Sequence, residues 1–104
     1  RAVGASAKVQ SGVGVAALVN GKQIAIFRLR GGSLHGISNY DPFSQANVIS
    51  RGLIGSLQGR AVVASPVYKQ HFDLHTGVCL EDDSVTLPTF AVIERDGEIL
   101  VIGA

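Results

Sequence analysis

The sequence has a single cysteine, Cys79, and neither methionine nor tryptophan among its 104 residues. One thiol excludes an internal disulfide framework and any site within one chain that needs four cysteines. No segment approaches the roughly 18 consecutive apolar residues of a membrane span, and residues 1–14 lack the long apolar run of a secretory signal. We therefore expect a cytoplasmic domain with no membrane partner.

Charge is also scarce. Nine basic and eight acidic residues give a net charge of +1, which offers no electrostatic attraction to nucleic acid or to an anionic membrane. The chain is instead 46% apolar with 13 glycines, a composition typical of a turn-rich domain that is long enough to bury a core. Because it begins with Arg1 and contains no methionine, we expect it to be part of a longer chain, which leaves a fusion to another subunit open.

Short apolar runs alternate with Gly, Asn and Asp, a pattern that indicates strands and turns rather than helices. Asn20-Gly21 and Asp96-Gly97 favour tight hairpin turns, which predicts paired strands at 15–19 with 23–29 and at 89–95 with 98–102. Further predicted elements are strands at 33–38, 60–64 and 71–74, a loop at 39–43, and one short helical turn between residues 50 and 55. Strands at this spacing favour a small sandwich or a partly closed barrel.

His71, Asp73 and His75 are the first candidates for a metal site, because imidazole and carboxylate suit zinc or iron. The period of two residues favours another interpretation, in which Phe72 and Leu74 face the core and the three polar side chains form the solvent face of a strand. We adopt this interpretation and predict no metal site.

No catalytic residue is predicted either. Cys79 lies among apolar neighbours, and we interpret it as a small buried hydrophobe. No serine has a nucleophile-elbow signature, and the glycines at 12 and 14 form no complete dinucleotide fingerprint. The acidic residues 81–83 are interpreted as a solvated turn, and His35 as a surface strand residue.

Two segments carry the strongest functional signal: Asn39-Tyr40-Asp41-Pro42, and Ser65-Pro66-Val67-Tyr68 with Phe72-Asp73 and Thr76-Gly77 after it. They resemble the two ligand segments of a Rieske iron-sulfur domain, in which Cys-x-His and Cys-x-x-His supply two thiolates and two imidazoles. In this chain the ligand positions are occupied by Asn39, Asp41, Ser65 and Tyr68. None of them is a thiolate or an imidazole, so we expect no cofactor in this chain.

From residue 14 to residue 101 the chain resembles the small subunits of cytoplasmic NAD(P)H-dependent assimilatory nitrite reductases, which keep the Rieske fold without the cluster. The most specific segments are residues 39–44, 48–52, 64–72 and 76–82. One departure from cluster-binding members is the 23 residues between Asp41 and Ser65, with the extra residues expected within 50–59. The resemblance implies an all-β, Rieske-like antiparallel sandwich or partly closed barrel with two tip loops, formed by residues 14–104 after an N-terminal extension or linker at 1–13.

The resemblance also implies a function: an accessory subunit, without catalytic residues, in the reduction of nitrite to ammonium. Its partner would be the large subunit, separate or fused, which carries FAD, an iron-sulfur cluster and sirohaem. The partner interface is expected at Tyr40, Phe43, Arg51, Tyr68 and Lys69. The apolar loop residues would alternatively fold inward to fill the space of the cluster, and both interpretations stay open. These residues are Tyr40, Phe43, Val48, Ile49, Leu53, Ile54, Leu57 and Tyr68.

An alternative function of a different class is a non-enzymatic protein-binding module on a ligand-less Rieske scaffold. An active Rieske ferredoxin is disfavoured, because it requires ligands that this chain lacks.

Overall fold

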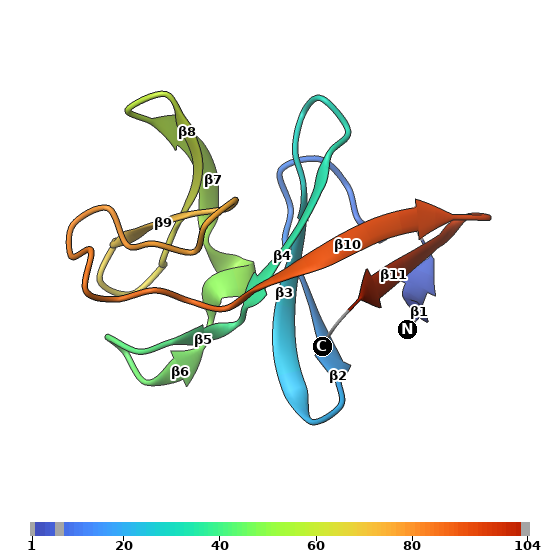
Figure 1. Cartoon of the computed structure of the whole chain (residues 1–104), viewed down its shortest axis with the longest axis horizontal. Coiled ribbons are helices and arrows are strands. Elements are labelled where there is room, and N and C mark those ends of the chain that lie inside the picture. Colours follow the sequence, from blue (N-terminus) through green and yellow to red (C-terminus); the bar gives the residue numbers. More distant parts are fainter. Residues whose placement is uncertain (1, 6–7, 103–104) are drawn as a thin grey trace.

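The computed structural model describes residues 2–5 and 8–102, and nearly all of their regular structure is β-strand (Figure 1). The elements are β1 (Ala2–Ala5), β2 (Val15–Val19), β3 (Lys22–Arg28), β4 (Leu34–Ser38), β5 (Tyr40–Asp41), β6 (Ala46–Asn47), the 3-10 helix η2 (Ile49–Arg51), β7 (Leu53–Leu57), β8 (Arg60–Ala64), β9 (His71–Asp73), β10 (Thr89–Arg95) and β11 (Glu98–Ile102). The predicted all-β fold is confirmed. No helix in these two ranges is long and apolar enough to cross a membrane.

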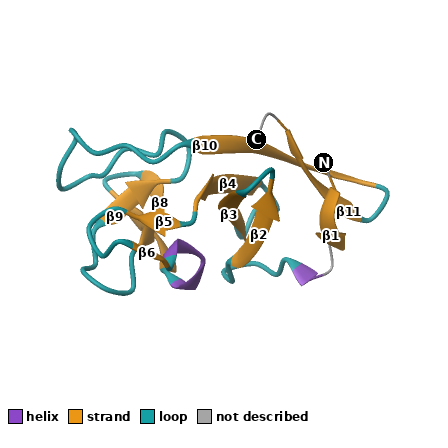
Figure 2. Cartoon of the chain, turned by 90° about the horizontal axis from the view of Figure 1, so that it is seen from below, coloured by secondary structure: helices purple, strands orange, loops and turns teal. Residues whose placement is uncertain are grey.

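Within the described residues, six strands form one antiparallel sheet in the order β1-β11-β10-β4-β3-β2. A smaller sheet has the order β7-β8-β9, and β5 pairs with β6. Figure 1 shows β5 to β9 on one side of the molecule, away from β1 and β11. Figure 2 shows the large sheet curling on itself, which agrees with the predicted partly closed barrel.

Strand β3 is buried on both of its faces, and it separates two hydrophobic clusters. Because successive side chains of a strand point to opposite faces, Ile24 and Ile26 pack inside the curl of the large sheet. Ala25 and Phe27 point the other way, into a cluster that includes Phe72 of the small sheet. The two sheets are thus joined through one strand with a continuous apolar run.

Both predicted hairpins are present. Val15–Val19 pair with Lys22–Arg28 around a turn in which Asn20 and Gly21 have φ values of 51° and 78°. The turn at Asp96 and Gly97 has nearly the same values, 52° and 78°. Positive φ at both central residues is the signature of the type I′ turn, which Asn-Gly and Asp-Gly favour.

Two segments differ from the sequence prediction, and the structure adds a strand in a third. The helical turn expected between residues 50 and 55 is the 3-10 helix at Ile49–Arg51, and from Leu53 the chain is already strand β7. The loop expected at 39–43 contains the short strand β5. Ala2–Ala5 pair with β11 and Val9 is buried in the core, while the proposed division of the chain after residue 13 stays a prediction.

Gly77 provides a test of this packing. Its φ is +81°, and a Cβ at this position would overlap the backbone carbonyl of Leu87. Gly59 has a similar φ of +74°, but a Cβ there would meet nothing within 4 Å, so Gly59→Ala carries only the backbone strain. We expect Gly77→Ala to lower the free energy of unfolding by about 2 kcal/mol more than Gly59→Ala, measured by urea unfolding. Equal losses would contradict the tight contact.

Candidate functional site

The first ligand-position loop begins where β4 ends, at Asn39. This side chain is 1% exposed, and all of its polar atoms are hydrogen bonded. Its Oδ1 accepts a hydrogen bond from the Ser50 backbone N–H at 2.7 Å, and its Nδ2 donates to Oε1 of Gln23 at 3.2 Å and to the carbonyl of Asn47 at 3.3 Å. Asn39 therefore links the loop to β3, β6 and the 3-10 helix.

The second ligand-position loop, residues 65–70, is a tight turn between β8 and β9. The Ser65 N–H donates to the carbonyl of Gln70 at 2.9 Å, and the Lys69 N–H donates to the carbonyl of Ser65 at 3.2 Å. Lys69 has a φ of 65°, an uncommon value for a residue other than glycine. Tyr68 is 61% exposed on this turn. The fourth ligand position is therefore on the surface, while the other three are buried.

A short hydrogen bond joins the two loops. The Ser65 hydroxyl donates to Oδ2 of Asp41 at 2.5 Å, and both residues are 0% exposed. The other carboxyl oxygen of Asp41 accepts the Phe43 N–H at 2.9 Å, and the Ser65 hydroxyl oxygen accepts the Val67 N–H at 3.3 Å. Two positions that are metal ligands in a Rieske domain thus form a direct link between the loops.

The residues at the four positions do not fit an iron-sulfur cluster. An amide, a carboxyl, a hydroxyl and a phenol replace two thiolates and two imidazoles. Asn39, Asp41 and Ser65 already use their polar atoms in hydrogen bonds within the protein, and Tyr68 is on the surface. In the part of the chain that the structure describes, no three His, Cys, Asp or Glu side chains are grouped so as to hold a metal ion.

The expected interface residues differ in exposure. Tyr40 is 44% exposed, and Arg51 and Lys69 are exposed, as is Tyr68. Phe43 instead packs inward, with its ring centroid 6.3 Å from that of Phe72. The two interpretations of the loop residues therefore apply to different side chains, and the interface itself stays a prediction.

Two exposed apolar side chains next to these loops are not among the expected interface residues. Leu53 is 76% exposed and Val67 is 46% exposed. Leu53 begins β7, directly opposite Ala64, which precedes the second loop. In the sequence, Leu53 belongs to a stretch whose apolar and polar residues do not alternate clearly. Only the strand register shows that Leu53 lies next to the second loop.

The prediction that His71, Asp73 and His75 form a solvent face is wrong for Asp73, the middle residue. Asp73 is 4% exposed, because its Oδ1 accepts the backbone N–H groups of His75 at 2.7 Å and Thr76 at 3.0 Å. This bonding fixes the turn after β9. His71 is half-buried, and its Nδ1 lies 2.6 Å from a carboxyl oxygen of Glu81. The core positions of Phe72 and Leu74 are confirmed.

Cys79 is buried in the core beside Phe72, as predicted. Burial raises the pKa of its thiol, which disfavours the reactive thiolate.

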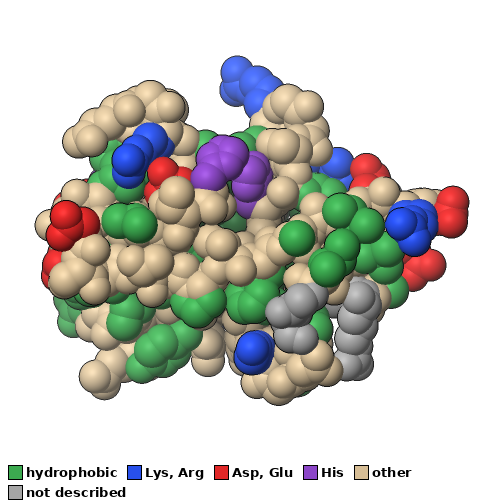
Figure 3. All heavy atoms as spheres, viewed as in Figure 1, with side chains coloured by type: hydrophobic (Ala, Val, Ile, Leu, Met, Phe, Trp, Pro, Cys, Tyr) green, Lys and Arg blue, Asp and Glu red, His purple; other side chains and the backbone are tan. Residues whose placement is uncertain are grey.

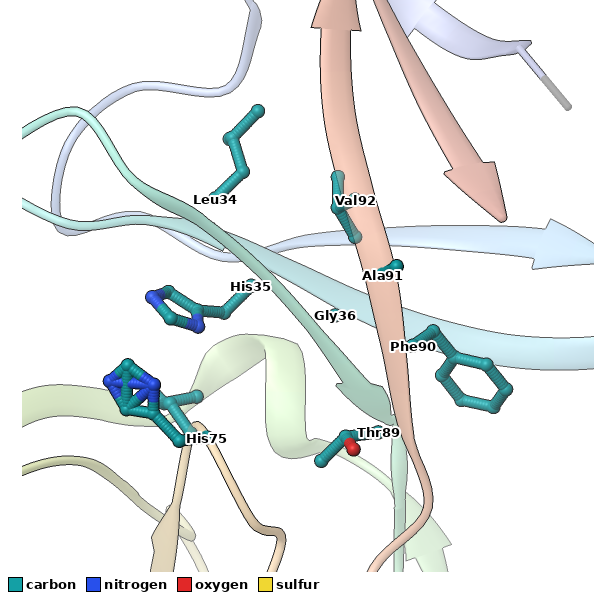
Figure 4. Close-up of a pocket in the computed structure, with 9 residues that line it drawn as sticks. Leu34, His35, Gly36, His75, Thr89, Phe90, Ala91 and Val92 are labelled. Carbon is teal, nitrogen blue, oxygen red and sulfur yellow. The ribbon is translucent and has the colours of Figure 1, made fainter. Parts of the chain in front are cut away.

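His35 is half-buried rather than on the surface, and it lies against His75. The ring centroids are 4.7 Å apart in an edge-to-face arrangement, at a groove of about 350 Å³ that is lined by β4, β10 and the turn after β9. Figure 4 shows both imidazoles on one side of β10, and Figure 3 shows histidine side chains together on this face. Burial lowers the pKa of His35, and the neighbouring His75 lowers it further. A hydrogen bond with the backbone of Leu74 and the carboxyl of Asp73 act in the opposite direction and raise this pKa.

Comparison with known proteins agrees with this geometry. Residues 1–102 match the family model of the Rieske-like [2Fe-2S] domain. The chain is 44% identical over 93 residues to the nitrite reductase (NADH) small subunit of Salmonella typhimurium, covering 88% of this chain and 86% of that protein. The chain belongs to the nitrite reductase small-subunit family of Rieske-like domains.

Two further relatives place this small-subunit domain in context. The solution structure of the nitrite reductase [NAD(P)H] small subunit from Erwinia carotovora superposes with a TM-score of 0.82 at 40% identity, covering 99% of this chain and 80% of that one. The nitrite reductase [NAD(P)H] large subunit of Klebsiella oxytoca is 35% identical over 88 residues, which cover 85% of this chain but 9% of that protein. A similar domain therefore also occurs within a large subunit.

The link between the loops predicts an energetic coupling between its two side chains. We expect Asp41→Ala and Ser65→Ala each to lower the free energy of unfolding by about 1–3 kcal/mol, because each leaves a buried polar partner unsatisfied. The double variant should lose less than the sum, by about 1–2 kcal/mol. Denaturant unfolding of all four proteins measures this coupling, and additive losses would contradict it. Ser56→Ala in exposed β7 is the control, with a change within about 0.5 kcal/mol.

The histidine pair predicts a pH dependence. The pKa of His35 lies below its ordinary value of 6.5, so the unfolded chain binds this proton more tightly than the folded one. The contribution of His35 to stability is therefore complete above the unfolded pKa and is lost as the pH falls towards the folded pKa. In an NMR titration, His75→Gln should raise the pKa of His35 without restoring it fully, since burial remains. His71→Gln should leave the titration of His35 unchanged, and an unchanged pKa in His75→Gln would contradict the coupling.

Proposed function

We propose that this domain is a cofactor-free accessory subunit of a cytoplasmic NAD(P)H-dependent nitrite reductase, acting in the assimilatory reduction of nitrite to ammonium. The observation that carries the proposal is the hydrogen bond between Asp41 and Ser65 in a member of the nitrite reductase small-subunit family. Two cluster-ligand positions serve here to hold the loops together. The domain then contributes structure and binding, without electron transfer of its own.

The proposed partner is the nitrite reductase large subunit, which would carry FAD, an iron-sulfur cluster and sirohaem and bind NAD(P)H. The similarity to a small section of the Klebsiella oxytoca large subunit supports a stable association, because a domain of this kind occurs there within the same chain as a large subunit. Tyr40, Phe43, Arg51, Tyr68 and Lys69 are the proposed contacts. Phe43 would contribute indirectly, because its ring packs against Phe72 in the interior and supports the first loop.

A first experiment tests whether the chain itself carries a cluster. Protein purified anaerobically is expected to be colourless and to contain no stoichiometric iron or sulfide, because none of the four ligand positions supplies a thiolate or an imidazole. The measurements are a visible absorption spectrum and iron and sulfide analysis of folded protein. Stoichiometric iron and sulfide would contradict the cofactor-free role and assign electron transfer to this chain.

A second experiment tests the accessory role. Adding the chain to a large subunit prepared without it should raise nitrite-dependent oxidation of NAD(P)H or the thermal unfolding temperature of the large subunit, because a ligand of the folded state stabilises it. Phe72→Ala, which should unfold the core, is the negative control. Absence of binding and of any effect on activity or stability would favour a protein-binding module for an unrelated partner.

A further inference from the structure

Four of the seven exposed large apolar side chains in the described residues lie on or next to the two ligand-position loops. Tyr40, Leu53, Val67 and Tyr68 are 44%, 76%, 46% and 61% exposed. We call these four residues the tip patch. The other exposed large apolar side chains of the described residues are Val13, Leu18 and Ile102.

Two contacts hold together the three segments that carry the tip patch. The hydrogen bond from Ser65 to Asp41 holds the second loop against the first, so Tyr40 lies one residue from the link, and Val67 and Tyr68 lie two and three residues from it. Leu53 joins from β7 through its pairing with Ala64, the residue before Ser65. All three segments belong to the side of the molecule formed by β5 to β9 (Figure 1).

The segments that carry the tip patch have basic but no exposed acidic side chains. Between residues 42 and 70 the sequence has three basic residues, Arg51, Arg60 and Lys69, and no Asp or Glu. Arg51 and Lys69 are exposed within the tip segments, whereas Arg60 lies at the far end of β8, where it pairs with Asp73.

Neighbouring acidic groups do not cancel this charge pattern. Asp41 is fully buried and hydrogen bonded to Ser65 and Phe43. Glu81 reaches the start of β9, but its two carboxyl oxygens bond the N–H and the ring of His71. Within the segments that carry the patch the exposed charges are therefore cationic, whereas Glu81, Asp82 and Asp83 form an exposed acidic turn after β9.

From this arrangement we propose that the tip patch docks onto an apolar surface rimmed by carboxylates on the nitrite reductase large subunit. Exposed aromatic and aliphatic side chains supply the centre of a protein interface, and complementary charges at its rim steer association. The proposal rests on the proposed function, which supplies the partner, and adds to it the contacts of Leu53 and Val67 and the chemistry of the partner surface. Leu53 and Val67 become central contacts, with Arg51 and Lys69 at the rim.

A protein partner fits better than an anionic membrane. Lipid-binding clusters gather about four to eight basic residues next to their apolar anchor, whereas the loops and β7 contribute two exposed cations, Arg51 and Lys69. Lys22 is one more, at the groove that Tyr40 lines. Nζ of Lys69 already donates to the carbonyl of Pro66 at 3.1 Å. So few cations can orient a protein partner but make a weak membrane anchor.

The test measures the dissociation constant of the full chain with the large subunit. Leu53→Ser and Tyr68→Ser alter exposed side chains and should each weaken binding about tenfold or more. Ile102→Ser is the matched control, because Ile102 is 50% exposed on β11, which lies on the other side of the molecule from β5 to β9 (Figure 1), and it should change binding less than about twofold. Circular dichroism of each variant confirms that it is folded.

A second pair of variants tests the rim. Arg51→Glu with Lys69→Glu should slow association and remove most of its dependence on sodium chloride. Arg30→Glu, which changes an exposed cation in the turn before β4, is the control for a change of charge alone.

Three results would overturn the docking proposal, each with a different meaning. Normal binding by the tip variants would leave the accessory role intact and exclude this surface. No binding by the unaltered chain would overturn the accessory role as well. Binding to vesicles of phosphatidylcholine and phosphatidylserine, lost in the Arg51→Glu and Lys69→Glu variant, would assign the patch to a membrane.

Discussion

The hydrogen bond between Ser65 and Asp41 is the contact on which the arrangement of the two ligand-position loops depends. It is buried, 2.5 Å long, and joins residues 24 positions apart in the sequence. In a Rieske domain the metal cluster crosslinks the same two loops. Here a hydroxyl and a carboxyl hold them, and further hydrogen bonds to Phe43 and Val67 satisfy the remaining atoms. The two loops are therefore linked directly by protein side chains.

The strand beneath this link is tightly packed and is hydrogen bonded to the first loop. Strand β3 is buried on both faces and belongs to both hydrophobic clusters. It also holds Gln23, whose side chain accepts a hydrogen bond from Asn39 in the first loop. Asn39 in turn binds the backbone of Ser50, which fixes the segment leading into β7. A polar network is favourable in a buried site only when its members are satisfied, and Asn39 meets that condition.

The predictable parts of the fold are those set by local chemistry. Asn20-Gly21 and Asp96-Gly97 specify their hairpins because both central residues need positive φ. Strand β7 escapes prediction because most of it is exposed, so its side chains lack the alternation that marks a half-buried strand. The period of two residues assigns Asp73 to the solvent face of its strand. It does not show that the carboxyl accepts a backbone hydrogen bond from the next turn and is buried there.

The candidate site is predictable as a set of positions but not as a structure. Family resemblance locates Asn39, Asp41, Ser65 and Tyr68 as replaced ligands, yet no local pattern indicates that two of them bond each other while Tyr68 lies outside. That division has a physical consequence. Because Asp41 and Ser65 satisfy one another in the interior, their hydrogen bond holds the two loops together directly. The outer residues of the loops take no part in this link, so their chemistry is open to another use, and exposed apolar groups gathered at one end of a domain are typical of an interaction site.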